Sequence, residues 1–209
     1  MARVSQEHLD ARRRQILDGA ARLFARNGFH ATSMQDVLKE VDLSAGAVYR
    51  YFSGKDELIA AIVKDVLGEI RASFEDVVRQ SPPPPPDLLV GAVLSRTLRV
   101  YSSLSDEGES VFPLLIMQVW AETVRNKELA AVLTEVYTTL REAWGRAVEA
   151  YQDAGMMPSD IPADHVARTM IATVQGFIAQ QALFGGAPVE VLQDGLRALT
   201  GMRAPQPDA

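Results

Sequence analysis

Apolar side chains recur at intervals of three and four residues along nearly the whole chain, and no segment alternates apolar and polar residues as a half-buried strand does. The first such segment spans Gln6–Arg26, and its expected inward face consists of Ile16, Ala20, Leu23 and Phe24. Asn27 and Gly28 end this helix, because both tolerate the left-handed backbone conformation that follows many helices. The spacing therefore predicts an all-α fold.

Three helix starts follow one another between Ser33 and Asp56. Ser33 and Asp36 have the spacing of a capping box, and Ser53 and Asp56 repeat it before a long helix that we expect to reach Arg79. Ser44 is expected to cap a short helix that runs from Ala45 to about Phe52. Asp42 precedes it and is expected to adopt the positive φ of a tight turn. The expected inward residues are Met34, Val37, Leu38 and Val41 in the first helix and Val48 and Phe52 in the second.

The segment Thr32–Phe52 thus has the layout of a helix-turn-helix, a motif whose second helix enters the major groove of DNA. Small residues at the start of that helix let its backbone approach the bases, and Tyr and Arg groups at its end donate to phosphates and base edges. Helix starts at Thr32 and Lys55 add donors where the helix dipole favours phosphate. Each residue taken alone could equally be a cap, a packing residue or a solvated charge, but the intact spacing favours DNA binding. The candidate DNA-binding residues are Thr32, Ser33, Gln35, Ser44, Ala45, Gly46, Ala47, Tyr49, Arg50, Tyr51 and Lys55.

The charge distribution agrees with this prediction although the total charge does not. The chain carries 21 basic and 27 acidic side chains, a formal net charge of −6. Residues 1–55 hold nine basic and six acidic side chains, so that this part is at +3 and the remainder at −9. A basic end on an acidic body directs one end of the molecule toward phosphates.

Several function classes are disfavoured by the residue inventory. The absence of cysteine excludes disulfides, thiolate metal sites and cysteine nucleophiles, and suits a cytoplasmic location. His8, His30 and His165 are scattered, and no Gly-rich phosphate loop or paired metal-ligand spacing occurs. No apolar run approaches the roughly 18 residues that cross a bilayer. We therefore expect no enzyme activity, metal, cofactor or membrane partner.

The five prolines Pro82–Pro86 separate the long helix from the rest. We expect a stiff polyproline II connection between helices and favour that interpretation over a ligand for an SH3-type domain. Further helices are predicted at Asp87–Ser103, Ser110–Arg125, Lys127–Gly155, Ala163–Phe184 and Val189–Leu199. The expected domains are a DNA-binding domain over 1–55, a ligand-binding and dimerisation domain over 56–202 and a disordered tail over 203–209.

Two sets of apolar residues in the second domain are candidates for binding. Aromatic and methionine side chains can line an adaptable ligand pocket or belong to an ordinary core. The ligand candidates are Phe74, Tyr101, Phe112, Met117, Trp120, Tyr137, Trp144 and Met170. Stripes on the last two helices suit a four-helix dimer interface or a core, and their residues are Val166, Met170, Val174, Phe177, Ile178, Gln181, Val189, Leu192, Leu196 and Leu199.

Two stretches, ILDGAARLFARNGFHATSMQDV from Ile16 and LSAGAVYRYFSGKDEL from Leu43, closely resemble the DNA-binding domain of TetR-family regulators. The resemblance covers about residues 10–63. It implies a three-helix DNA-binding head joined by a linking fourth helix to a larger helical body. It also implies homodimerisation through the last two long helices and release of DNA when a small molecule binds.

The resemblance also implies roles for individual residues. Tyr49 and Lys55 match positions that commonly contact phosphates, Tyr51 matches a backbone-contacting aromatic residue or histidine, and Ser44–Ala47 match the base-reading turn. Asp42 departs from the usual glycine. Ala47 departs from the usual Thr or Ser, which leaves more of the readout to Arg50, Gln35 and DNA shape.

We therefore expect a sequence-specific transcriptional regulator of bacterial type, a homodimer released from double-stranded operator DNA by a small-molecule effector. The alternatives are an all-α small-molecule-binding protein or enzyme with an incidental basic helix pair, and an architectural DNA binder without a ligand. An enzyme requires a catalytic constellation, which the sequence lacks. An architectural DNA binder requires a far more basic chain.

Overall fold

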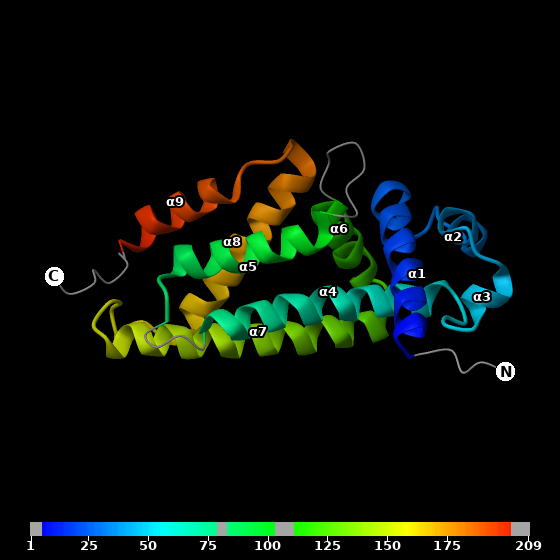
Figure 1. Cartoon of the computed structure of the whole chain (residues 1–209). Helices are drawn as coiled ribbons and strands as arrows, with labels where there is room; N and C mark the ends of the chain where they lie inside the picture. Colours follow the sequence, from blue (N-terminus) through cyan, green and yellow to red (C-terminus); the bar gives the residue numbers. More distant parts are fainter. Residues whose placement is uncertain (1–5, 79–82, 103–110, 202–209) are drawn as a thin grey trace. The chain divides into compact units, whose positions relative to one another are not determined.

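The computed structural model describes residues 6–78, 83–102 and 111–201, and within these ranges it is built from helices without any strand (Figure 1). The helices are α1 (Gln6–Asn27), α2 (Met34–Val41), α3 (Ala45–Tyr49), α4 (Lys55–Val78), α5 (Pro86–Ser102), α6 (Val111–Thr123), α7 (Lys127–Asp153), α8 (Ala163–Phe184) and α9 (Val189–Thr200). The predicted all-α fold is confirmed.

Two compact units make up the chain. The first contains the residues up to Val66 and Tyr101–Ala130, and the second contains Leu67–Val100 and the residues from Ala131 onward. Both α4 and α7 begin in the first unit and end in the second. The functional division after residue 55 stays a prediction.

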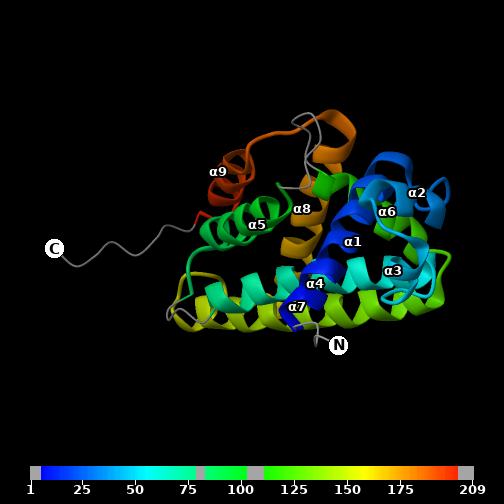
Figure 2. The same ribbon diagram turned by 45° about the vertical axis from the view of Figure 1, so that its right-hand side comes forward.

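The first unit is organised around α1, and α2 and α3 lie together beside it in both views (Figures 1 and 2). The predicted inward face of α1 is buried, and the ring of Phe24 meets that of Phe29 edge to face at 5.0 Å. Gly28 follows the helix with φ +82°, as its position predicts. At Gly19 the α1 backbone comes so close to α2 that an added Cβ would lie 2.4 Å from Cγ1 of Val41.

Helix α6 also belongs to the first unit, which the sequence did not indicate. It packs against α1, and the side chain of Gln118 lies next to Gly28. Nε2 of His30, in the turn after α1, lies 3.1 Å from Oε2 of Glu122. Helix α6 is therefore a structural part of the unit that carries α2 and α3.

In the second unit, the later parts of α4 and α7 meet through Phe74 and Trp144, whose rings are 5.0 Å apart. The Tyr151 hydroxyl donates to the carbonyl of Pro84, and burial raises the Tyr151 pKa. Helix α9 lies along α5 in both views, and the Gln193 side chain donates to the Asp87 carbonyl at 3.3 Å (Figures 1 and 2).

Most helix ends agree with the sequence to within two residues. One difference is Pro86, expected in the proline connection but found as the first residue of α5, where a proline loses no helical hydrogen bond. The second is α3, expected to reach about Phe52 but ending at Tyr49, because the next residues form turns before the cap of α4. The expected positions Arg79, Ser103 and Ser110 and the tail 203–209 lie outside the described residues.

Candidate nucleic-acid interface

The predicted capping box at the start of α2 is present. The Ser33 amide donates to Oδ2 of Asp36 at 2.9 Å, and the Asp36 amide donates to Oγ of Ser33 at 3.3 Å. Side-chain and backbone hydrogen bonds from Ser33 hold the pKa of Asp36 below its usual value. The start of α2 is thus fixed by groups that lie within four residues of one another.

The turn between α2 and α3 depends on Asp42. This residue has φ 51° and ψ 50°, the left-handed conformation predicted for it, and no other described non-glycine residue has a positive φ. The amides of Asp42 and Leu43 donate to the carbonyls of Lys39 and Leu38, both at 3.3 Å. These bonds satisfy the end of α2 and let α3 begin two residues later, as a helix-turn-helix requires.

Helix α3 is short and is held by its cap and its core residues. Oγ of Ser44 accepts from the Ala47 amide at 3.3 Å. Val48 and Phe52 are buried as predicted, and the Phe52 amide donates to the Val48 carbonyl at 3.1 Å, although α3 has ended. Both anchors therefore remain on one side of the segment, which leaves the other side exposed.

Three polar side chains on this exposed surface, Gln35, Tyr49 and Arg50, make no hydrogen bond or ion pair with the described part of the chain. Tyr49 is 49% exposed, a large value for a tyrosine. Gly46 adds open backbone to this surface, because a Cβ placed there would meet nothing within 4 Å. We call Gln35, Gly46, Tyr49 and Arg50 the reading surface, since these groups are free to meet a partner.

Two other candidate residues use their polar groups in hydrogen bonds within the protein. Thr32 is 1% exposed and its hydroxyl donates to the Gly28 carbonyl at 2.9 Å. The Lys55 ammonium donates to the carbonyls of Phe29 at 3.0 Å and Thr32 at 3.3 Å. Lys55 therefore ties the first turn of α4 to the turn before α2, and one of its three N–H groups is left over.

The remaining candidate residues flank the reading surface. Ser33 and Ser44 are exposed and act as the caps described above, Ala45 is exposed, and Ala47 and Tyr51 are half-buried. The structure thus brings the candidate DNA-binding residues together around α2, α3 and the start of α4.

The cap of α4 differs in detail from the sequence prediction. Glu57, not Asp56, accepts from both the amide and the hydroxyl of Ser53, each at 2.7 Å. The reason is that α4 begins at Lys55, so Glu57 is its third residue and lies one position later than the acidic residue that the sequence pattern indicates. These bonds hold the pKa of Glu57 below its usual value.

Several residues that support the reading surface were missed in the sequence. Nε2 of Gln15 donates to the Val41 carbonyl at 3.0 Å, and Gly19 allows the close approach of α2 to α1. Glu40 pairs with Arg22 at 3.2 Å and with Arg26 at 3.4 Å, so two of the basic side chains are used within the unit. No local pattern marks such residues, because their partners lie far away in the sequence.

The ligand candidates fall into both units. In the first, Phe112 is buried with its ring 5.4 Å from that of Tyr101, and Met117 and Trp120 are half-buried. In the second, Phe74, Trp144 and Met170 are buried and Tyr137 is half-buried.

The candidate dimer residues differ in burial. Met170, Phe177, Ile178 and Leu196 are buried within the single chain, and Val166, Val174, Gln181, Val189 and Leu192 are half-buried. Oε1 of Gln181 accepts from the Ala187 amide at 3.0 Å. Leu199, also a residue of the stripes, is exposed, and so are the large apolar side chains of Leu183, Phe184 and Val191.

The described residues contain no group of three or more His, Asp and Glu side chains placed to hold a metal ion. Among the same residues, none of the helices is both long and apolar enough to span a membrane.

Comparison with protein families gives two matches. Residues 16–62 match the bacterial regulatory proteins of the tetR family, and residues 92–202, more than half of the chain, match the C-terminal region of BetI-type transcriptional repressors. The chain is similar to the HTH-type transcriptional regulator UidR of Escherichia coli K12, with 26% identity over 193 residues that cover 90% of this chain and 91% of UidR. It is 29% identical to the uncharacterized HTH-type transcriptional regulator YfiR of Bacillus subtilis strain 168 over 187 residues, which cover 87% of this chain and 85% of YfiR.

Solved structures agree with this assignment. GusR of Salmonella enterica is similar with a TM-score of 0.69 and 25% identity, covering 96% of this chain and all of GusR. AibR, solved with isovaleryl coenzyme A and operator DNA, has a TM-score of 0.69 at 18% identity, covering 92% of this chain and all of AibR. A putative transcriptional regulator from Saccharomonospora viridis in complex with choline has a TM-score of 0.72 at 18% identity, covering 92% of this chain and 96% of that protein. The latter two show a likeness of fold alone.

The local geometry of α2 and α3, the two family matches and the relatives of similar length lead to the same assignment. The chain belongs to the TetR family of bacterial transcriptional regulators, with a C-terminal region of the BetI type.

Proposed function

We propose that this regulator is a repressor that binds operator DNA through α2 and α3 and is released by a small-molecule effector. The observation that carries the proposal is the reading surface, in which Gln35, Tyr49 and Arg50 are exposed and unbonded within the described chain while their helices are firmly capped. Groups without internal partners are suited to make hydrogen bonds with DNA.

We assign base and phosphate contacts to different residues. The start of α3, with Ala45 and Gly46, lies in the major groove, and Gln35 and Arg50 donate to base edges, where such bonds distinguish base pairs. Tyr49 and the remaining N–H of Lys55 contact phosphates, which fixes the orientation of the protein without reading sequence. Thr32, Ser33 and Ser44 mainly hold the helices in place.

We further propose a homodimer formed by α8 and α9. The exposed residues Leu183, Phe184, Val191 and Leu199 provide the apolar contact, and the half-buried residues of the stripes surround it. A two-fold dimer places two recognition helices on half-sites about one turn of DNA, roughly 34–36 Å, apart.

The effector is assigned to the aromatic and methionine candidates. Because relatives of the same fold are bound to molecules as different as isovaleryl coenzyme A and choline, the fold accommodates varied ligands. The effector acts through α4, the unbroken helix from Lys55 to Val78, whose movement changes the spacing of the two reading surfaces. A ligand that prefers the DNA-incompetent spacing by about 1.4 kcal/mol weakens DNA binding about tenfold.

The first test is fluorescence anisotropy of the purified protein with a duplex of its own promoter region at two salt concentrations. We expect tight, salt-dependent binding for wild type and a loss of binding for the Arg50→Ala/Tyr49→Phe variant. A promoter–reporter fusion that is repressed by wild type and released by the double variant supports repression. The protein is also refolded to remove any bound effector. If it then binds promoter and random DNA with equal affinity, the proposal is contradicted.

A further inference from the structure

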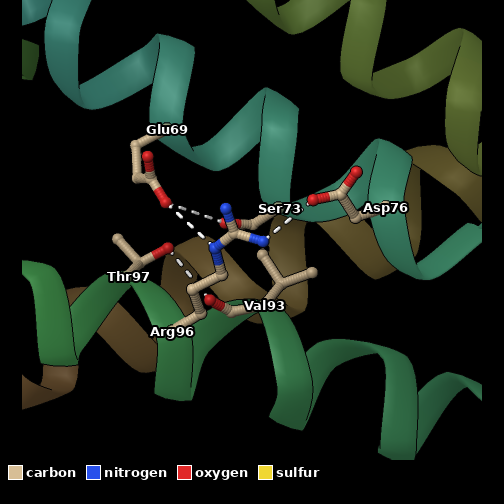
Figure 3. Close-up of polar contacts among 6 residues, drawn as sticks. All are labelled: Glu69, Ser73, Asp76, Val93, Arg96 and Thr97. Carbon is tan, nitrogen blue, oxygen red and sulfur yellow. Dashed lines mark hydrogen bonds and ion pairs between the residues drawn. The ribbon is translucent and has the colours of Figure 1, made fainter.

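A polar cluster joins α4 to α5 within the second unit (Figure 3). Arg96 of α5 donates from Nε to Oε1 of Glu69 at 3.1 Å and from Nη1 to Oδ2 of Asp76 at 2.9 Å. Glu69 and Asp76 are seven residues apart on one face of α4, and Ser73 lies between them with its hydroxyl donating to Oε1 of Glu69 at 3.3 Å. One guanidinium thus holds two carboxylates of another helix.

Two small polar side chains next to this cluster are buried. Ser73 is 0% exposed and Thr97 of α5 is 1% exposed, and the Thr97 hydroxyl donates to the Val93 carbonyl at 2.9 Å. Both hydroxyls are thus bonded within their own helices, to Glu69 on α4 and to Val93 on α5. The polar contacts between the two helices are therefore made by Arg96, and they depend on the axial position of α4.

The geometry of the ion pairs supports this role. Arg96, Glu69 and Asp76 are all partly exposed, so their pairing adds little to the free energy of unfolding. The backbone positions that carry the two carboxylates are however seven residues, about 10 Å, apart along α4, and both side chains reach one guanidinium. A displacement of α4 by one turn, about 5.4 Å, carries both carboxylates past the guanidinium and breaks at least one pair. The cluster therefore contributes little to stability, but it forms only at one axial position of α4 relative to α5.

Helix α4 connects this register to the DNA-binding segment through a continuous backbone. Its first residue, Lys55, is bonded to the carbonyls of Phe29 and Thr32 just before α2. Its later half carries Glu69 and Asp76. The same helix is therefore tied by polar groups near both of its ends.

We propose that Arg96 is a positioning residue that fixes the register of α4 against α5 and thereby sets the affinity of the reading surface for DNA. The proposal rests on the proposed function and names the contact through which the state of the second unit is transmitted along α4.

The test compares Arg96→Gln with Arg71→Gln. Arg71 is also on α4, but its ion pair is with Glu75 of the same helix at 3.8 Å, so its substitution removes an ion pair within one helix instead of one between two helices. For each variant, promoter affinity by anisotropy and the thermal midpoint by circular dichroism are measured on the same preparation. We expect Arg96→Gln to weaken promoter binding about five- to tenfold with a midpoint close to wild type, and Arg71→Gln to change neither.

A second readout separates positioning from ordinary stabilisation. The chain has no cysteine, so Ala11→Cys on the exposed side of α1 gives a single spin-label site per chain. We expect Arg96→Gln to shift or broaden the label-to-label distance in the dimer, and Glu69→Gln/Asp76→Asn to reproduce both effects without adding to them. The proposal is overturned if Arg96→Gln binds the promoter within twofold of wild type. It is also overturned if Arg96→Gln and Arg71→Gln lose promoter affinity equally. If wild type itself does not bind the promoter, the proposed function fails instead.

Discussion

The two surfaces assigned to partners in this protein are built from opposite chemistry. The reading surface on α2 and α3 is polar, and its supporting caps join groups only three residues apart, such as Ser33 with Asp36. The surface on α8 and α9 exposes large apolar side chains, with Phe184 at 82% and Leu199 at 84% exposure. A polar surface is stable in water without its partner, whereas an apolar one is not. The comparison predicts a permanent dimer that binds DNA reversibly.

The largest expected effect comes from placing charge on the apolar surface. Phe184→Asp/Leu199→Asp should weaken dimerisation by at least about 100-fold, because central apolar anchors of an interface each contribute about 2 kcal/mol or more. Sedimentation equilibrium measures the dissociation constant, and promoter affinity should fall with it.

Val124→Asp is the matched control, because Val124 is 87% exposed on the first unit and carries no role in the proposed dimer. Its dissociation constant should equal that of wild type. A dimer that tolerates the double substitution as well as the control shows that α8 and α9 are not the interface.

A smaller loss is expected on the polar surface. Arg50→Ala should weaken promoter binding by about 1–3 kcal/mol, roughly 5- to 160-fold, without changing the thermal midpoint, because the Arg50 side chain makes no hydrogen bond or ion pair within the described residues. Anisotropy and circular dichroism on the same sample check both parts.

Lys55→Ala sharpens the distinction between reading and supporting residues. It removes hydrogen bonds to Phe29 and Thr32, so it should lower both the thermal midpoint and the promoter affinity. If Arg50→Ala also lowers the midpoint, Arg50 supports the fold rather than reading DNA.

Two glycines of the first unit should respond oppositely to alanine. Gly46→Ala meets open space and should raise stability by roughly 0.5–1 kcal/mol while lowering promoter affinity, since the added methyl lies where the backbone approaches DNA. Gly19→Ala should instead destabilise the protein by about 1–3 kcal/mol, because the new Cβ collides with Val41. Urea unfolding with a promoter titration tests the pair, and unchanged promoter affinity in Gly46→Ala contradicts close backbone approach.

The smallest effect concerns pH. The pKa of Asp36 is lowered by Ser33, so its capping bonds stabilise the folded state above the usual pKa of the carboxyl and lose this contribution as the pH falls through the lowered value. Asp36→Asn should therefore make the thermal midpoint less dependent on pH below about 4. A pH dependence identical to that of wild type shows that the cap does not contribute.

The same contrast explains what the sequence predicts well. The cap at Ser33, the positive φ of Asp42 and the inward positions of Val48 and Phe52 depend on neighbours within a few residues, and all are found as expected. The error at Ser53, where Glu57 replaces Asp56 as the acceptor, is a displacement of one residue in the helix start.

Contacts between segments that are distant in the chain could not be predicted from the sequence. Periodicity placed Phe177 and Ile178 on a stripe but could not decide whether the same chain or a second copy covers them, and the structure buries them within one chain. The association of α6 with α1 and the bonds from Lys55 to Phe29 likewise join residues far apart in the chain. Such contacts depend on tertiary packing, which the spacing of residues does not encode.

DNase I footprinting of the promoter region with wild type and Arg50→Ala tests whether the reading surface binds operator DNA. We expect two protected half-sites about one helical turn of DNA apart for wild type, and their loss in a variant that remains folded and dimeric. A wild-type dimer, freed of bound small molecules by refolding, that leaves the promoter unprotected would contradict it.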